Sequence, residues 1–256
     1  MKNQILITLD SLRWDVFNQC PGDLFLKKFD YAKAFTHVTY TLPAHTAFFT
    51  GKLPCNFKGK YDTCARSGRR LTGQPQWRLM NPESDGPAII KLQGKDIVDG
   101  FNKKGYFTIG TGAVGWFNHN KPAHIPVIDN FQSYMWFGEF IVARQQTAFV
   151  SDQIQQALKH KQPYFAFINF GETHHSYRIN SSSPAIPYGN HERCFMAQSR
   201  CLVYLDKLIK DFIDPLENVD IIICSDHGDC MGENGLWGHS FFHEKVIEVP
   251  IVKISK

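Results

Sequence analysis

The sequence predicts an α/β fold, a three-layer sandwich whose central sheet is mainly parallel. Two short apolar runs, Ile5–Leu9 and Ile221–Ser225, are rich in β-branched residues and have the length of buried strands. Two longer stretches, residues 143–160 and 192–212, space their apolar residues as amphipathic helices do. Strands that alternate with helices are typical of a parallel sheet covered on both faces, and 256 residues are enough for one such domain.

The composition favours one domain over residues 1–256 that acts on small anionic molecules. The net charge is +4 and the pI is near 8.6, and the only basic cluster is short, at residues 66–70, so nothing indicates a nucleic acid partner. No apolar segment approaches the length of a membrane span. Because Met1–Gln4 leads directly into the first strand, we expect no signal peptide and a cytoplasmic location.

The cysteine pattern favours reduced thiols. The seven cysteines are scattered and form no C-x-x-C pair, which fits a reducing compartment better than a disulfide framework. Cys55 and Cys64 flank a polar loop, where a zinc clip is an alternative.

The first predicted strand, Ile5–Leu9, delivers Asp10 at its carboxyl end. The segment 11–33 that follows is expected to be a helix interrupted at Pro21-Gly22. Pro43 is well placed to open a helix over 44–49, with Gly51 as its terminator. Thr41 precedes this helix, where its hydroxyl is either an ordinary N-cap or a nucleophile whose pKa the helix N-terminus helps to lower.

The middle of the chain contains a long loop and two further elements. Residues 52–95 are rich in Gly, Pro, Arg and Asn, and are expected to form a long excursion over the active-site edge of the sheet. A helix at 97–104 and a strand at 106–110 follow, and then an aromatic loop at 113–120 that suggests a pocket wall. His119 and His124 are expected at the surface or the pocket rim.

The third predicted strand, residues 164–170, ends in a polar cluster. Glu172, His174 and His175 lie directly after it. The 192–212 helix and the strand that ends before Asp226 follow, and residues 249–252 form the last strand.

Asp226 and His227 follow the apolar run at 221–225 as abruptly as Asp10 follows the first strand. Open α/β sheets keep their sites at the carboxyl ends of their strands. If the two strands are neighbours, Asp10 and Asp226 can share one divalent cation with His227. The plainer alternative is that each aspartate only caps the helix that follows it.

These clusters together resemble the alkaline phosphatase superfamily, and most closely its sulfatase-like and phosphodiesterase-like branch. The blocks that carry the resemblance stand in that family's order: residues 7–15, 41–51, 173–177, 225–228 and 238–250. The resemblance implies that Asp10, Asp226 and His227 are metal ligands and that Thr41 is the nucleophile and also touches the metal. It implies a catalytic or second-metal role for His174 and His239, with Glu172 and His175 as further possible second-site ligands. It also implies that the family's usual C-terminal subdomain is lacking.

Departures from the family pattern direct the expected chemistry towards phosphorus. The sulfatase signature needs a Cys or Ser that is oxidised to formylglycine, whereas here the motif reads Thr41-Leu42-Pro43-Ala44-His45. The family's Gly-Lys-x-His block is also missing, since Gly112 is followed by Ala113. We therefore expect little activity on sulfate esters.

The expected reaction is hydrolysis of a phosphate ester, phosphodiester or phosphonate ester through a phosphothreonine intermediate. The small anionic substrate would meet one or two divalent ions, and oxygen and imidazole ligands suit Zn or Mn better than Mg. One alternative is a phosphoryl or phosphonyl transferase on the same site. Another is a non-catalytic, metal-stabilised binding protein. The sequence indicates no membrane partner and leaves the oligomeric state open.

Overall fold

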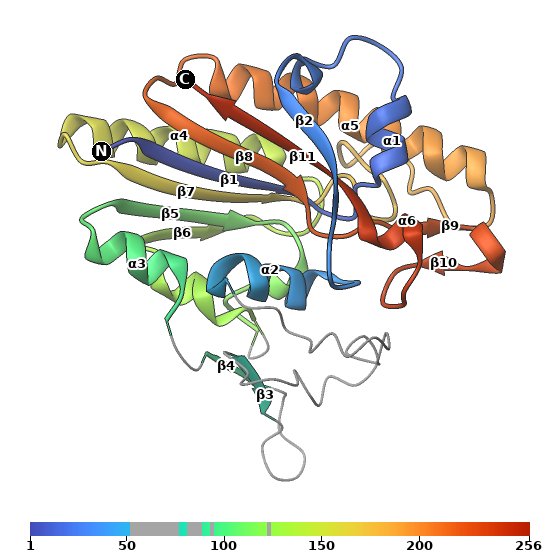
Figure 1. Ribbon diagram of the computed structural model, residues 1–256, viewed down its shortest axis with the longest axis horizontal. Coiled ribbons are helices and arrows are strands. Elements are labelled where there is room, and N and C mark those ends of the chain that lie inside the picture. Colours follow the sequence, from blue (N-terminus) through green and yellow to red (C-terminus); the bar gives the residue numbers. More distant parts are fainter. Residues whose placement is uncertain (52–76, 81–88, 93–94, 122–123) are drawn as a thin grey trace.

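The structure is a computed structural model that describes residues 1–51, 77–80, 89–92, 95–121 and 124–256. Its centre is a seven-stranded sheet with the strand order β2-β11-β8-β1-β7-β5-β6 (Figure 1). The strands of this sheet are β1 (Asn3–Leu9), β2 (Asp30–Phe35), β5 (Phe107–Gly112), β6 (Ser133–Trp136), β7 (Tyr164–Phe170), β8 (Val219–Ser225) and β11 (Glu248–Ser255). Neighbouring strands from β8 to β6 are parallel, and β11 runs antiparallel to β8 and β2. The mainly parallel α/β sheet that the sequence predicts is confirmed.

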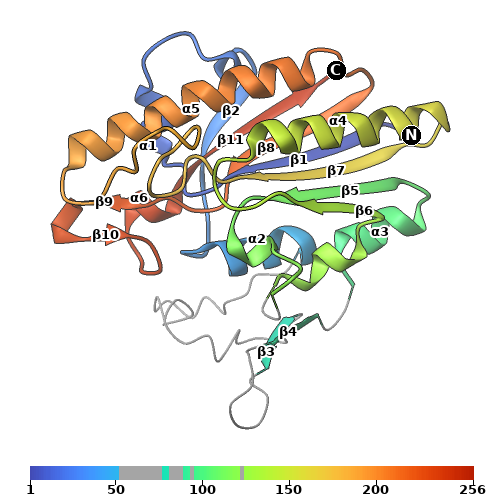
Figure 2. The same cartoon turned by 180° about the vertical axis from the view of Figure 1, so that it is seen from behind.

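Helices cover both faces of the sheet. The helices are α1 (Trp14–Gln19), α2 (Thr41–Thr50), α3 (Ile97–Lys103), α4 (Ala143–Lys159), α5 (His191–Ile213) and α6 (Glu244–Ile247). The long helices α4 and α5 lie on one face, and α2 and α3 lie on the other, as the views from front and back agree (Figures 1 and 2). Within the described residues, no helix is both long and apolar enough to cross a bilayer.

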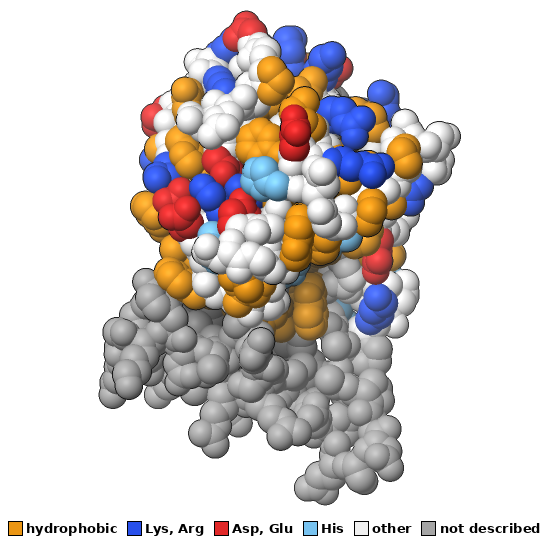
Figure 3. All heavy atoms as spheres, turned by 90° about the vertical axis from the view of Figure 1, so that its right-hand side faces the viewer, with side chains coloured by type: hydrophobic (Ala, Val, Ile, Leu, Met, Phe, Trp, Pro, Cys, Tyr) orange, Lys and Arg blue, Asp and Glu red, His pale blue; other side chains and the backbone are white. Residues whose placement is uncertain are grey.

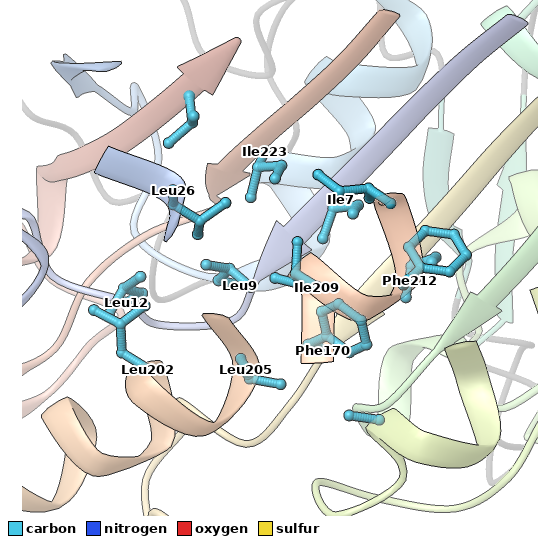
Figure 4. Packing of buried hydrophobic residues seen from close by; sticks show 14 of the residues in the cluster. Ile7, Leu9, Leu12, Leu26, Phe170, Leu202, Leu205, Ile209, Phe212 and Ile223 are labelled. Carbon is cyan, nitrogen blue, oxygen red and sulfur yellow. The ribbon is translucent and has the colours of Figure 1, made fainter. Parts of the chain in front are cut away.

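Two hydrophobic clusters hold these layers together. Alternate residues of β7 point to opposite faces, so Ile168 and Phe170 join the cluster under α4 and α5, while Phe165 and Phe167 join the cluster with α2 and α3. In the larger cluster, the leucines of α5 pack over β1 and β8, as Figure 4 shows. Burial on both faces is why the sequence of β7 is almost continuously apolar.

The register of the three central strands aligns their carboxyl ends. Leu9 of β1 pairs with Ser225 of β8 on one side and with Phe170 of β7 on the other. Asp10, Asp226 and Gly171 are the next residues of these strands, and therefore emerge side by side at one edge of the sheet.

Several sequence expectations are wrong in detail. The segment 11–33 is not one interrupted helix, because it holds only the short α1, a 3-10 turn at Phe25–Lys28 and the start of β2. The helix after Thr41 begins at Thr41 itself rather than at residue 44, and ends at Gly51 in the left-handed conformation with φ 67°. β2 was missed because it is a largely exposed edge strand, with little of the apolar alternation that marks a buried strand.

Smaller elements complete the described chain. β9 (Cys230–Met231) pairs with β10 (Trp237–Gly238), and β3 (Trp77–Met80) pairs with β4 (Ile89–Leu92). Apart from β3 and β4, the predicted excursion at 52–95 lies almost wholly outside the described residues, and so do Cys55 and Cys64. The five cysteines in the described part of the chain are all free and buried.

Candidate active site

Ser11 ties together the two aspartates that follow β1 and β8. Its backbone N–H donates to Asp226 Oδ1 at 3.1 Å, and its hydroxyl donates to Asp10 Oδ1 at 3.0 Å. Ser11 reaches both because its backbone adopts φ 61°, a conformation uncommon outside glycine. The side chain of Gln198 donates to the Ser11 carbonyl at 2.9 Å and holds this turn in place.

His227 completes a group of three possible metal ligands. Its Nδ1–H donates to the Gly228 carbonyl at 3.0 Å, which leaves the lone pair on Nε2. This Nε2 lies 3.5 Å from Asp226 Oδ2 and 3.4 Å from Thr41 Oγ1. Ligand atoms of Asp10, Asp226 and His227 all lie within 4.8 Å of one another.

A divalent cation fits this group. Asp226 Oδ2 is buried and has no hydrogen-bond partner, although buried polar atoms normally have one. Two carboxylates and one imidazole are a donor set that Zn²⁺ and Mn²⁺ accept readily. The orphaned oxygen therefore points to a ligand, which the residues present are suited to bind.

The electrostatics of the group support the same conclusion. Burial raises the pKa of the Asp10 carboxyl, and the charge of Asp226 raises it further. Burial likewise raises the pKa of Asp226 to about 6. Burial, followed by the charge of His239, lowers the pKa of His227 to about 4, so this imidazole is neutral at pH 7. Two buried carboxylates repel one another, and a bound cation would relieve that repulsion.

Thr41 lies at the start of α2 and faces this group. Its Oγ1 donates to Asp10 Oδ2 at 3.4 Å. Tyr40, not Thr41, occupies the N-cap position, and no side chain caps the helix there. The alternative in which Thr41 is an N-cap is therefore wrong, and its hydroxyl lies beside the carboxylate and imidazole groups instead.

His45 belongs to the site but was given no role from the sequence. It lies one helical turn after Thr41, fully buried, and its Nδ1–H donates to the Thr41 carbonyl at 2.9 Å. Thr8 Oγ1 donates to its Nε2 at 3.1 Å, and Asn169 donates to Thr8 at 3.0 Å. Burial lowers the pKa of His45 to about 3, so it is a neutral ring 3.8 Å from Asp226 Oδ2. The four-residue spacing from Thr41 was the signal for it.

His239 lies next to His227, with 4.4 Å between ring centroids, and pairs with a second missed residue, Asp229. His239 Nδ1 donates to Asp229 Oδ1 at 2.6 Å. Burial alone would raise the pKa of Asp229, but the hydrogen bond and charge of His239 outweigh it and lower the pKa to about 2. Burial alone would lower the pKa of His239, yet Asp229 raises it above its usual value. His227, Asp229 and His239 form a second group whose ligand atoms lie within 4.8 Å of one another.

His174 and His175 lie beside the site. The His174 ring is 5.6 Å from that of His239 and stacks on Phe140, with 4.9 Å between centroids. The His175 ring stacks on Tyr188 at 3.6 Å. Within the described residues, neither histidine belongs to a group of potential metal ligands.

Glu172 is turned towards α4 instead of the metal ligands. Its Oε1 accepts a hydrogen bond from the backbone N–H of Ala143 at 2.8 Å, at the start of α4. Burial raises its pKa to about 8. Its Oε2 is buried and has no hydrogen-bond partner, and within the described residues Glu172 belongs to no group of potential metal ligands, so its role as a second-site ligand stays a prediction.

In the part of the chain that the structure describes, the two other histidines singled out in the sequence belong to no group of potential metal ligands. His124 pairs with Asp129, and His119 packs edge-on against Tyr134. Figure 3 looks onto the end of the molecule where β9 and β10 lie, and there histidine side chains reach the surface among hydrophobic and charged ones.

Comparison with known proteins agrees with this fold. A model of the Sulfatase family matches residues 2–256. Choline-sulfatase from Rhizobium meliloti (strain 1021) is 40% identical over 55 residues, which are 19% of this chain and only 11% of that protein.

Solved structures share the fold at low identity. The C-terminal periplasmic domain of phosphoethanolamine transferase EptC from Campylobacter jejuni has a TM-score of 0.62 and 15% identity, over 100% of this chain and 79% of that one. Lipoteichoic acid synthase LtaP from Listeria monocytogenes has a TM-score of 0.61 and 14% identity, over 98% and 65%. The 2-O GAG sulfatase BT1596 has a TM-score of 0.59 and 14% identity, over 100% and 64%. Since the family model covers almost the whole length, the chain belongs to the sulfatase family of the alkaline phosphatase superfamily.

Proposed function

We propose that this protein is a metal-dependent hydrolase of phosphate or phosphonate esters, phosphodiesters included, and that it works through a phosphothreonine intermediate. The observation that carries the proposal is the position of Thr41 Oγ1, 3.4 Å from both Asp10 Oδ2 and His227 Nε2. A hydroxyl among potential metal ligands and at a helix N-terminus is suited to nucleophilic attack.

Asp10, Asp226 and His227 would hold a divalent cation, Zn²⁺ or Mn²⁺, with Thr41 beside it. When bound, such a cation supplies positive charge for phosphoryl oxygens and lowers the pKa of a neighbouring hydroxyl. His239 or His174 would protonate the leaving group or take part in a second ion site.

The residues of this chain would divide the reaction into two steps. Thr41 Oγ1 loses its proton to solvent and forms a bond to phosphorus while the bond to the leaving oxygen breaks, and a protonated histidine passes a proton to that oxygen. Water then attacks the phosphothreonine and returns a proton to the histidine, and the Thr41 oxygen regains a proton from solvent as the second product leaves. His45 would keep the first turn of α2 in position through its hydrogen bond to the Thr41 carbonyl.

Phosphorus is preferred over sulfur as the reacting centre because of the nucleophile. Threonine cannot be converted to formylglycine, on which the usual sulfatase route depends. A transferase, in which an acceptor hydroxyl replaces water, is the second candidate, and the fold shared with a phosphoethanolamine transferase favours it. A small anionic substrate and a cytoplasmic location stay predictions.

A substrate panel with metal analysis tests the proposal. The metal-loaded protein is assayed with p-nitrophenyl phosphate, bis-p-nitrophenyl phosphate, a p-nitrophenyl phosphonate and p-nitrophenyl sulfate, with Thr41→Ala as the matched control. We expect one of the phosphorus esters to turn over fastest and Thr41→Ala to bind metal without turnover. Faster turnover of the sulfate would contradict the proposal, and stoichiometric metal without any turnover would favour a binding protein.

Product analysis in the presence of an added alcohol separates the two enzymes. A hydrolase releases phosphate, a phosphate monoester or a phosphonate, according to the ester supplied, whatever the alcohol, whereas a transferase forms a new ester with it.

A further inference from the structure

The buried carboxylate of Asp229, which is outside the metal group of Asp10, Asp226 and His227, is hydrogen-bonded to His239. The Asp229 side chain is fully buried, and each of its oxygens has its own partner: His239 Nδ1 lies 2.6 Å from Oδ1, and the Tyr188 hydroxyl donates to Oδ2 at 3.2 Å. The Tyr188 ring is in turn stacked on His175, with 3.6 Å between centroids.

The backbone of Asp229 is anchored as well. Its carbonyl accepts a hydrogen bond from Arg13 Nη1 at 3.3 Å. Arg13 is itself buried, and pairs with Asp15 at 2.6 Å and with Glu233 at 2.8 Å. The carboxylate therefore has a fixed position from which it can orient His239.

We propose that Asp229 is a positioning residue, which with Tyr188 fixes the ring and tautomer of His239 so that Nε2 is the nitrogen presented to the leaving-group oxygen. A hydrogen bond from Nδ1 to a carboxylate fixes both the tautomer and the plane of an imidazole. The proposal rests on the proposed function and chooses His239 as its proton donor.

The proton balance of the step is simple. Thr41 Oγ1 loses its proton to solvent as it forms its bond to phosphorus, and His239, as the imidazolium, passes its Nε2 proton to the departing oxygen as the ester bond breaks. The Nδ1 proton stays on the His239 ring and remains hydrogen-bonded to Asp229 throughout. The water that later attacks the phosphothreonine returns a proton to Nε2, and the Thr41 oxygen regains its proton from solvent as its bond to phosphorus breaks.

An alternative interpretation of the same cluster is that it binds a metal ion through His227, Asp229 and His239. The contact of 2.6 Å between His239 Nδ1 and Asp229 Oδ1 favours the hydrogen bond, because two ligands at about 2.0–2.2 Å from a tetrahedral ion lie farther apart than that. Both Asp229 oxygens and His227 Nδ1 are also engaged in hydrogen bonds.

Leaving-group dependence is the kinetic test. The metal-loaded enzyme and its variants are assayed with a p-nitrophenyl ester, whose leaving group departs without a proton, and with the alkyl ester of the same phosphoryl group. We expect Asp229→Ala to lower kcat for the alkyl ester by about a hundredfold more than for the p-nitrophenyl ester. His239→Ala should show the same pattern, and the double variant should lose no more than His239→Ala alone.

Two milder variants and a control sharpen the test. Asp229→Asn keeps an oxygen that can accept from Nδ1 and should lose less than Asp229→Ala, and Tyr188→Phe should lose less still. Asp206→Asn alters a buried carboxylate that accepts from the backbone of Phe25 and Leu26, away from His239, and should affect both esters equally. Equal losses on both esters in Asp229→Ala, or additive losses in the double variant, would overturn the proposal.

Two further measurements do not depend on turnover. Proton–nitrogen spectra should show an Nδ1 proton on His239 that is lost in Asp229→Ala and kept in Asp229→Asn. If His239 carries its proton on Nε2 alone, the positioning role is wrong even where hydrolysis is found. If no ester is turned over but the Nδ1 proton is present, the proposed function fails while the positioning of His239 stands. Loss of one bound metal equivalent in Asp229→Ala would instead establish that Asp229 is a metal ligand.

Discussion

Ser11 holds the two carboxylates of the metal group in register through its backbone and its side chain. It donates one hydrogen bond to Asp226 and one to Asp10, and each bond uses the oxygen Oδ1. The oxygens Oδ2 are therefore the ones turned towards a cation: one accepts only from Thr41, and the other has no partner. The Oδ1 atoms thus make hydrogen bonds within the fold, and the Oδ2 atoms are the ones available to a cation.

Replacing Asp226 by Asn should stabilise the metal-free protein above pH 6. Burial raises the pKa of Asp226 from 3.8 to about 6. Below pH 3.8 the carboxyl is protonated in both states and does not destabilise the fold, and the free energy of unfolding falls as the pH rises through about 6. Each pKa unit corresponds to about 1.4 kcal/mol, so the gain in the free energy of unfolding should grow to at most about 3 kcal/mol at pH 7. Denaturant unfolding of the metal-free proteins between pH 4 and pH 8 measures this difference.

The same substitution should weaken metal binding, so added Zn²⁺ should raise the melting temperature of the wild type far more than that of Asp226→Asn. Asp211→Asn, an exposed substitution on α5, serves as the control and should change neither quantity. A difference between Asp226→Asn and wild type that does not vary with pH would show that the buried carboxylate is not strained without metal.

The positions of these residues are set by the ends of the strands and the start of the helix that carry them. β1 and β8 are adjacent and parallel, so the aspartates that follow them lie side by side, and α2 begins with Thr41 beside them. Gly51 ends α2 at φ 67°, and its N–H donates to the Ala47 carbonyl at 2.8 Å. A left-handed residue at this position is an ordinary way to end a helix.

Gly51→Ala should lower the free energy of unfolding by about 1–2 kcal/mol, the cost of a left-handed conformation with a Cβ atom. An added Cβ would meet nothing within 4 Å, so the cost would come from the backbone alone. Gly100 of α3 provides the matched control, because it has equal space and no positive φ. Gly100→Ala should raise stability by about 0.5–1 kcal/mol. Denaturant unfolding of both variants checks the pair, and a loss of stability in both would contradict this explanation.

At the scale of the whole molecule, residues that end a buried strand could be predicted, and residues that act through tertiary contacts could not. Asp10, Asp226 and His227 follow apolar runs directly, so their place at the sheet edge could be inferred. Glu172 has the same sequence context, yet its Oε1 accepts a hydrogen bond from the backbone N–H at the start of α4, and only the packing of α4 reveals this.

Asp229 shows the limit of such reasoning. It stands two residues after His227, but its importance comes from His239 and Tyr188, which are distant in sequence. The edge strand β2 was not predicted for a related reason. It is defined by its pairing with β11, and its own sequence has almost no apolar pattern. The prediction of a single domain over residues 1–256 stays a prediction.

Detection of phosphothreonine tests the central proposal most directly. The metal-loaded protein is mixed with the phosphate ester it turns over fastest, quenched in acid within one turnover, digested and examined by mass spectrometry, with Thr41→Ala as the control. We predict one phosphoryl group on the peptide that contains Thr41, formed as fast as the first turnover, and no such peptide in Thr41→Ala, whose turnover should fall by orders of magnitude. Full turnover without any phosphorylated peptide, together with wild-type turnover in Thr41→Ala, would contradict the covalent mechanism.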